Sequence, residues 1–169
     1  SIMFGTRFDK DLMHRAFHAV PPTMNAPDGT PTNAVFGFIA MLLKFIDISN
    51  PDAIVCAFDA GRPKFRTEAL EQYKAQRPPM DPGLKAQFPI IEELLESMSI
   101  PVVRVTGWEG DDILGTVAAR DEALGYRTLL VSGDKDVYQL CSELTHVVTT
   151  RKGITDVAIY GPAEVLERY

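Results

Sequence analysis

The fold follows from residues 101–136, which read PVVRVTGWEGDDILGTVAARDEALGYRTLLVSGDKD. The apolar run at 101–105 predicts a buried strand, and residues 109–124 predict a helix that Gly125 closes at its C-terminus. A second apolar run, at 127–132, predicts the next strand. A strand, a helix and a strand at this spacing predict two parallel strands joined by a crossover helix.

The same alternation extends in both directions along the chain. NAVFGFIAMLLKFID (33–47) predicts a largely buried helix with Thr32 as its N-cap, and AIVCAF (53–58) predicts a buried strand. Further elements are expected as follows: a helix over 82–98 capped by Asp81, a short helix over 136–142, strands at 145–149 and within 154–160, and a helix opened by Pro162. We therefore predict one α/β domain over 1–169, with a mainly parallel central sheet and helices on both faces. Residues 1–8 do not have the pattern of a strand.

Composition favours an ordinary globular protein. The chain has 169 residues, of which 46% are hydrophobic and 24% are charged. No apolar run reaches the 18 or so residues of a membrane span, and the N-terminus does not have the pattern of a secretion signal. Cys56 and Cys141 lie far apart in apolar segments, which suggests neither a disulfide framework nor a zinc cluster. We expect a reducing, cytoplasmic setting.

Charge is unevenly distributed. The net charge of −6 argues against a nucleic-acid partner, but residues 62–85 carry six basic groups and only three acidic ones. The basic groups are Arg62, Lys64, Arg66, Lys74, Arg77 and Lys85. A basic segment beside an acidic body is typical of a metal-dependent phosphodiesterase, because cations fill the acidic site and the basic segment holds phosphates.

Acidic residues follow three of the expected strands. They are Asp59 after the first strand, Glu109, Asp111 and Asp112 after the second, and Asp134 and Asp136 after the third. Ligands of open parallel sheets bind beyond the carboxyl ends of the strands, so these side chains are expected at one edge. Each cluster has a local explanation, namely a turn aspartate at Asp59, helix-dipole compensation at Asp111 and Asp112, or an N-cap at Asp134.

Convergence of six carboxylates favours a metal site over these local explanations. Carboxylates that lie close together repel one another unless cations neutralise them. Mg²⁺ or Mn²⁺ prefers such oxygen ligands, and two ions would activate water and stabilise charge on a phosphate. His14, His18 and His146 have no motif that requires a role in catalysis.

Five motifs carry a resemblance to a known family. GTPTNAVFGF (29–38), AFDAGRPKFR (57–66), YKAQRPP (73–79), GWEGDD (107–112) and SGDKDVYQL (132–140) resemble the 5′-nuclease domain of bacterial DNA polymerase I, in the flap endonuclease family. The motifs occur in the family's order, and the resemblance covers roughly residues 12–169.

The resemblance implies a role for each matching residue. Asp59, Glu109, Asp111, Asp112, Asp134 and Asp136 would be metal-site residues. Lys74 and Arg77 would steer the scissile phosphate, and Arg15 would contact DNA. His14 stands where a tyrosine is common and would stack on a base or pack. Arg62, Lys64, Arg66 and Tyr73 would contact DNA from a basic arch over about residues 60–85. Trp108 is expected to brace the acidic loop rather than contact substrate. The implied partner is DNA with 5′ ends or flaps, with a polymerase fused in the parent protein as a further option.

Two departures from the family pattern affect these expectations. Strict alignment puts Phe8 at the first metal position of the family, so Asp9 fits only if one residue has been lost, and Asp11 is a further option. The chain also stops before the family's Gly-Asp-x-Ser-Asp-Asn segment and helix-hairpin-helix region, which bring two more aspartates. We therefore expect weak or no nuclease activity from these 169 residues alone.

Three alternative functions remain open from sequence alone. A catalytically degenerate domain could bind branched DNA or another protein without cutting. A ribonuclease of the related PIN type shares the acidic architecture. A phosphatase of the haloacid dehalogenase type fits less well, because Asp9-Lys10-Asp11 lacks the apolar strand that should precede its nucleophile.

Overall fold

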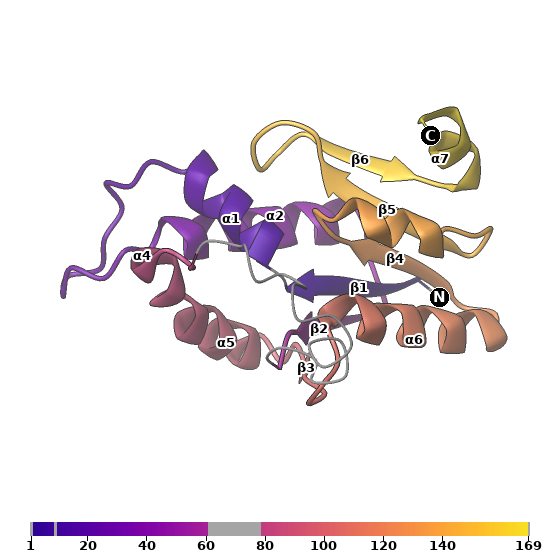
Figure 1. Ribbon diagram of the computed structural model, residues 1–169, viewed down its shortest axis with the longest axis horizontal. Helices are drawn as coiled ribbons and strands as arrows, with labels where there is room; N and C mark the ends of the chain where they lie inside the picture. Colours follow the sequence, from indigo (N-terminus) through magenta and orange to yellow (C-terminus); the bar gives the residue numbers. More distant parts are fainter. Residues whose placement is uncertain (1, 9, 61–78, 169) are drawn as a thin grey trace.

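A single sheet forms the centre of the computed structural model, which describes residues 2–8, 10–60 and 79–168 (Figure 1). In chain order its strands are β1 (Ile2–Phe8), β2 (Ala53–Phe58), β3 (Val102–Val103), β4 (Arg127–Val131), β5 (Thr145–Thr150) and β6 (Val157–Tyr160). They lie side by side in the order β3-β2-β1-β4-β5-β6. The first five strands of this order pair in parallel, and β6 pairs antiparallel with β5. The sheet is therefore mainly parallel, as predicted.

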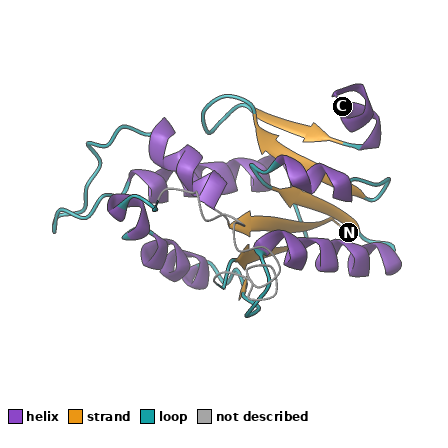
Figure 2. Cartoon of the chain, in the orientation of Figure 1, coloured by secondary structure: helices purple, strands orange, loops and turns teal. Residues whose placement is uncertain are grey.

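Helices cover the sheet (Figure 2). They are α1 (Lys10–Ala19), α2 (Asn33–Ser49), α4 (Pro82–Lys85), α5 (Phe88–Ser97), α6 (Gly110–Ala123), the 3₁₀ helix η1 (Lys135–Leu140) and α7 (Pro162–Arg168). The chain leaves α2 through Asn50, a left-handed C-cap whose N–H donates to Ile46 O. Gly125, at φ +77°, follows the end of α6 as predicted.

Two hydrophobic cores lie on opposite faces of the sheet, because successive side chains of a strand point to opposite sides. Phe58 and Val131 belong to the core formed with α1, α2 and α5. Ala57 and Leu130, their neighbours in sequence, belong to the core formed with α6 and η1. Coverage of both faces is the architecture that the alternating strands and helices predicted, and Figure 1 shows α2 and α6 on opposite sides of the sheet.

The expectation for residues 1–8 was wrong. Residues 2–8 form β1, which pairs with β2 on one side and β4 on the other, at the centre of the sheet. Its sequence, IMFGTRF, interrupts the apolar run with Gly5 and Arg7. Strand formation there depends on pairing with both neighbours, which a local pattern does not report.

The expected helix over 82–98 is two helices. Asp81 caps α4 by accepting a hydrogen bond from the Gly83 N–H at 2.7 Å, as predicted. Pro89 in the first turn of α5 prevents one continuous helix, because proline has no N–H to donate to the carbonyl of Lys85. The chain therefore breaks between Lys85 and Phe88 and starts a new helix.

The expected strand at 101–105 is limited to Val102 and Val103, which pair with Cys56 and Ala57. The pairing ends there because the chain turns back, with the Trp108 N–H donating to Val105 O at 3.1 Å. β3 is the edge strand of the sheet on this side.

A buried polar network joins α2 to the α4–α5 break. Gln87, which is fully buried, donates to Asn33 Oδ1 at 3.0 Å and to Gly83 O at 3.0 Å. Its side-chain oxygen accepts from the Val35 N–H in the first turn of α2. Asn33 in turn donates to Phe17 O in α1 at 2.7 Å. The network thus satisfies backbone groups of three helices at once.

The described helices are too short or too polar to cross a bilayer. The longest of them, α2, has 17 residues. A transmembrane helix needs about 20.

Candidate metal and nucleic-acid site

The six predicted metal residues all lie at the carboxyl edge of the sheet. Asp59 directly follows β2, and Asp134 follows β4 after Ser132 and Gly133. Glu109, Asp111 and Asp112 lie at the start of α6, and Asp136 lies in η1. The parallel order of the strands thus brings segments that are far apart in sequence to one edge, as the sequence predicted.

Asp59 connects β2 to the start of α6. Its Oδ1 accepts a hydrogen bond from the Gly110 N–H at 2.6 Å. The first N–H groups of a helix have no partner within the helix and carry its positive dipole end, so a carboxylate is a favourable acceptor there. This bond fixes the distance between the end of β2 and the acidic start of α6.

Glu109 and Asp112 form a capping box at the start of α6. The Glu109 N–H donates to Asp112 Oδ2 at 3.0 Å, and Glu109 itself is only 5% exposed. The Thr116 hydroxyl donates to Asp112 O one turn further along. Helix capping therefore holds these side chains in fixed positions, in addition to any role with a metal.

Asp134 caps η1, as its local explanation predicted. Its Oδ1 accepts from the Asp136 N–H at 2.9 Å, while its own N–H donates to Ser132 Oγ at 3.1 Å. The cap turns the chain sharply after β4, and Asp136 is then exposed at the start of η1.

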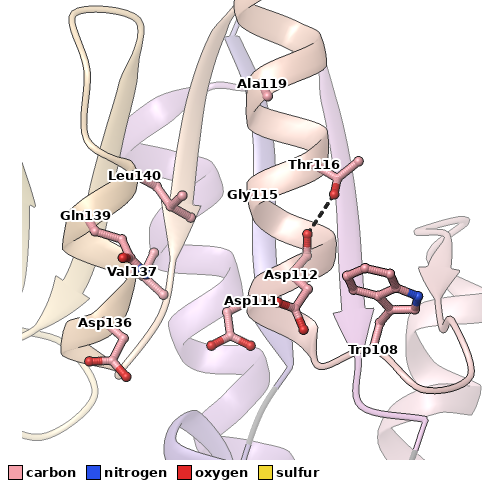
Figure 3. A pocket seen from close by; sticks show the side chains of 10 residues that line it. All are labelled: Trp108, Asp111, Asp112, Gly115, Thr116, Ala119, Asp136, Val137, Gln139 and Leu140. Carbon is pink, nitrogen blue, oxygen red and sulfur yellow. Dashed lines mark hydrogen bonds between the residues drawn. The ribbon is translucent and has the colours of Figure 1, made fainter. Parts of the chain in front are cut away.

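A cavity of 690 Å³ lies between α6 and η1 (Figure 3). Three of the six predicted carboxylates line it, those of Asp111, Asp112 and Asp136. Figure 3 shows them in a row, with Asp136 at one end and the indole of Trp108 beyond the other. Thr116 and Gln139 also line this cavity. Gln139 lies within the 132–140 motif but was not predicted as a site residue, and Thr116 lies in none of the five motifs.

The donors in this cavity fit a hard cation. All three acidic groups are carboxylates, and the lining residues that the structure describes include no histidine or cysteine. Within residues 2–8, 10–60 and 79–168, however, no three His, Cys, Asp or Glu side chains are close enough to hold an ion as they stand. Asp59, Glu109 and Asp134 do not line the cavity. An ion bound there would need further ligands or rotated side chains.

Arg15 lies at the same edge of the sheet, beside the end of β5. Its guanidinium donates to the backbone oxygen of Thr150 and, at 2.8 Å, to the Thr150 hydroxyl. Thr150 was not predicted to take part in the site, since 135 residues separate it from Arg15 and it has no motif. The rings of His14 and His18 stack, with 5.7 Å between their centroids. His14 therefore packs against another side chain of α1.

Seven of the predicted site residues lie outside the part of the chain that the structure describes. They are Asp9, Arg62, Lys64, Arg66, Tyr73, Lys74 and Arg77. Most of the expected arch over residues 60–85 also lies outside it. These assignments remain predictions from the sequence.

Comparison with protein families gives one match over nearly the whole chain. Residues 9–169 match the model of the 5′-3′ exonuclease, N-terminal resolvase-like domain. DNA polymerase I of Geobacillus stearothermophilus is 44% identical to the chain over 158 residues, and DNA polymerase I of Bacillus subtilis (strain 168) is 42% identical over 158 residues. Each match covers 94% of this chain but 18% of the polymerase, so the chain spans less than a fifth of these relatives.

Solved structures share the fold at low sequence identity. The T5 D15 protein, co-crystallised with metal ions, has a TM-score of 0.73 at 16% identity, covering 99% of this chain and 60% of that one. The bacteriophage T5 D15 flap endonuclease in complex with DNA and metal ions has a TM-score of 0.68 at 16% identity, covering 98% and 60%. The catalytic core of Rad2 with DNA substrate gives 0.54 at 13% identity, covering 98% and 49%.

Proposed function

The chain belongs to the family of 5′-3′ exonuclease N-terminal, resolvase-like domains, and we propose that it hydrolyses DNA phosphodiesters as a divalent-metal-dependent 5′-3′ exonuclease or flap endonuclease core. The observation that supports the activity is the row of carboxylates of Asp111, Asp112 and Asp136 along one cavity at the carboxyl edge of the sheet. Such an acidic row is stable next to DNA phosphates only with cations present.

The proposed metal ligands are these three carboxylates, with Asp59, Glu109 and Asp134 bound directly or through water. Mg²⁺ or Mn²⁺ fits carboxylate oxygens better than a softer metal does. Two such ions would supply a water nucleophile and charge stabilisation at the phosphate. The chain itself would hold the acidic groups in fixed positions. It does so through the hydrogen bond that the Gly110 N–H donates to Asp59 and through the cap at Asp134.

Asp9 is a further proposed ligand. Phe8, the last residue of β1, pairs with Phe58, which directly precedes Asp59. Asp9 therefore follows β1 in sequence as Asp59 follows β2, which supports Asp9 over Phe8 or Asp11 as the counterpart of the family's first aspartate.

The DNA contacts that we propose come mainly from basic residues. Lys74 and Arg77 would steer the scissile phosphate, and Arg15 with Arg62, Lys64, Arg66 and Tyr73 would hold the strand. The full-length protein would act on 5′ ends or flaps, in the bacterial cytoplasm, with a polymerase in the same chain as in the DNA polymerase I relatives.

We expect the 169-residue chain to cleave weakly on its own, because the described carboxylates do not form a ready group of three. The test is cleavage of a labelled 5′-flap duplex at low salt, with Mn²⁺ and with EDTA. Asp136→Asn should lower the Mn²⁺-dependent rate by about 10-fold or more, since it removes a carboxylate from the cavity. Asp52→Asn is the matched control, because Asp52 precedes β2 and so lies at the opposite edge from Asp59.

Each other outcome has a clear meaning. DNA binding without cleavage in any metal would favour a degenerate DNA-binding domain. Faster cleavage of RNA than of DNA would favour a PIN-type ribonuclease. Equal rates for Asp136→Asn and Asp52→Asn would contradict the proposed metal site.

A further inference from the structure

A second cavity adjoins the first at the end of the acidic row where Asp112 and Trp108 lie. It has a volume of 410 Å³ and shares Trp108, Asp112 and Thr116 with the first cavity. Its remaining lining is apolar and consists of Val103, Val105, Ile113 and Val117. An apolar cavity therefore adjoins the acidic one along the start of α6.

A tight turn places Trp108 at the boundary between the two cavities. The Trp108 N–H donates to Val105 O at 3.1 Å, and Gly107 has φ +85°. A glycine at the third position of such a turn is typical of a type II turn, because φ is positive there. The turn brings the indole back beside Val105, and 49% of the Trp108 surface stays exposed.

We propose that the apolar cavity receives one unstacked nucleobase of the DNA substrate, with Trp108 as the surface on which the base stacks. The base would belong to a nucleotide next to the scissile phosphate, because the cavity shares three residues with the acidic cavity. This inference rests on the proposed function.

Size and chemistry both favour a base as the occupant. The volume falls within the roughly 300–1,000 Å³ typical of small-ligand sites. Among the described residues, the lining contains a carboxylate and no basic residue, so this part of the lining would repel a phosphate but not an uncharged aromatic base. Stacking on an aromatic side chain is available to every base, which suits a nuclease that tolerates any sequence.

Trp108 is the single tryptophan of the chain, so its fluorescence reports directly on the cavity. The experiment titrates the 169-residue chain, in Ca²⁺, with three labelled 5′-flap duplexes. One is intact, one is abasic at the two nucleotides that flank the flap junction, and one is abasic at two nucleotides of the flap tip. Anisotropy of the label measures overall binding in the same samples, and a gel checks that the DNA stays intact.

The intact and tip-abasic duplexes should quench Trp108 equally. The junction-abasic duplex should leave the fluorescence unchanged and bind about 5- to 150-fold more weakly, the range expected for loss of base–aromatic stacking. Trp108→Leu should weaken binding of the intact duplex by the same factor and lose the distinction between the intact and junction-abasic duplexes. Trp108→Phe should keep that distinction, because phenylalanine still offers a ring.

A second variant tests the cavity without changing the tryptophan. Val117→Phe should fill the cavity and abolish the preference for the intact junction. Leu124→Phe is its matched control, since Leu124 lies just after the end of α6, is 62% exposed and does not line the cavity. Thermal melting by circular dichroism verifies that each variant is folded.

Three results would overturn the inference. In the first, anisotropy shows that DNA binds, with an affinity that neither Trp108→Leu nor the abasic junction changes. In that case the base site is wrong and the proposed function is unaffected. If no duplex binds at all, both fail. A shift of Trp108 fluorescence with protein concentration in the absence of DNA would show that a second copy of the chain occupies the cavity instead.

Discussion

At the scale of single residues, Gly37 allows α2 to pack closely against α1. A Cβ built on Gly37 in α2 would lie 2.8 Å from Ala16 Cβ and 3.1 Å from Val20 Cγ2. The two helices can therefore touch only because residue 37 has no side chain.

Gly37→Ala should destabilise the fold by about 1–3 kcal/mol, because α1 and α2 must separate to admit the methyl group. Chemical denaturation followed by circular dichroism measures this free energy of unfolding. Gly115→Ala is the matched control in α6, where the new Cβ would lie 3.4 Å from Leu140, an ordinary contact. That variant should be unchanged or up to about 1 kcal/mol more stable. An equal loss in both variants would contradict this account of the packing.

At this scale the sequence predicted where the acidic residues lie, after the strands, but not their hydrogen bonds. The position of Asp59 at a strand end was readable from the chain, whereas its bond to Gly110, 51 residues away, was not. Local patterns report periodicity and caps, so they identified Asp134 as a cap. They contain no information on which distant backbone group a side chain reaches, as with Arg15 and Thr150.

At the scale of elements, a side chain in α6 holds the start of β5. Glu122 accepts hydrogen bonds from the Ser142 and Thr145 hydroxyls. These bonds, with that from Ser142 the larger cause, lower the pKa of Glu122 below its ordinary value. The carboxylate is therefore favoured in the folded chain.

The contribution of Glu122 to stability should depend on pH. Because the pKa is lower in the folded chain, the contribution is complete above the ordinary value of about 4.3 and is lost as the pH falls through the lowered value. Glu122→Gln should cost less than about 1 kcal/mol at pH 7, since solvent screens this group, and the cost should disappear once the pH falls below the lowered pKa of Glu122. Glu143→Gln, an exposed neighbour, is the control. A cost for Glu122→Gln that grows as pH falls would contradict this reasoning.

The polar network around Gln87 fixes how α2 meets α4 and α5. Gln87→Met keeps the approximate volume but leaves the Val35 N–H and Asn33 Oδ1 buried without these bonds. We expect a loss of about 1–3 kcal/mol in the free energy of unfolding, measured by urea denaturation. Gln139→Met, at an exposed position, should stay within about 0.5 kcal/mol of the parent. A loss as small for Gln87→Met would show that the network contributes little.

Elements were predictable where one local signal sufficed. The bounds of β2 matched because its apolar run is uninterrupted, and α6 matched because acidic residues mark its start and Gly125 follows its end. β1 was missed because its stability comes from pairing on both sides. The split between α4 and α5 was readable from Pro89 but was hidden by the apolar periodicity around it.

At the scale of the whole molecule, the strand order arranges the carboxyl edge as a line. Trp108 lies past β3 at one end, the carboxylates follow β3, β2 and β4, and Arg15 lies beside β5 at the other end. Four strand spacings of about 4.8 Å give this line a length of roughly 19 Å. A DNA strand bound along this line would meet the proposed aromatic surface, the proposed metal site and Arg15 in succession.

Arg15→Ala should therefore weaken binding of DNA with little dependence on its sequence. Loss of one phosphate contact should reduce the slope of log affinity against log salt by about one. The measurement is anisotropy of a labelled flap duplex over a salt series. Arg120→Ala is the control, because Arg120 lies in the last turn of α6, away from the acidic start of that helix. An unchanged slope for Arg15→Ala would remove this residue from the proposed DNA path.

The central position of β1 also has a consequence for how the chain is made. Met3 pairs with Ala53, but Ile2 on the same strand pairs with Arg127. At a synthesis rate of about 5–20 residues per second, the second partner of β1 leaves the ribosome several seconds after the first. During that interval the β1–β2 pair exposes an unpaired strand edge, a known starting point for aggregation. The yield of folded protein should therefore rise when more chaperone is present during translation, even if the completed fold is stable without chaperones.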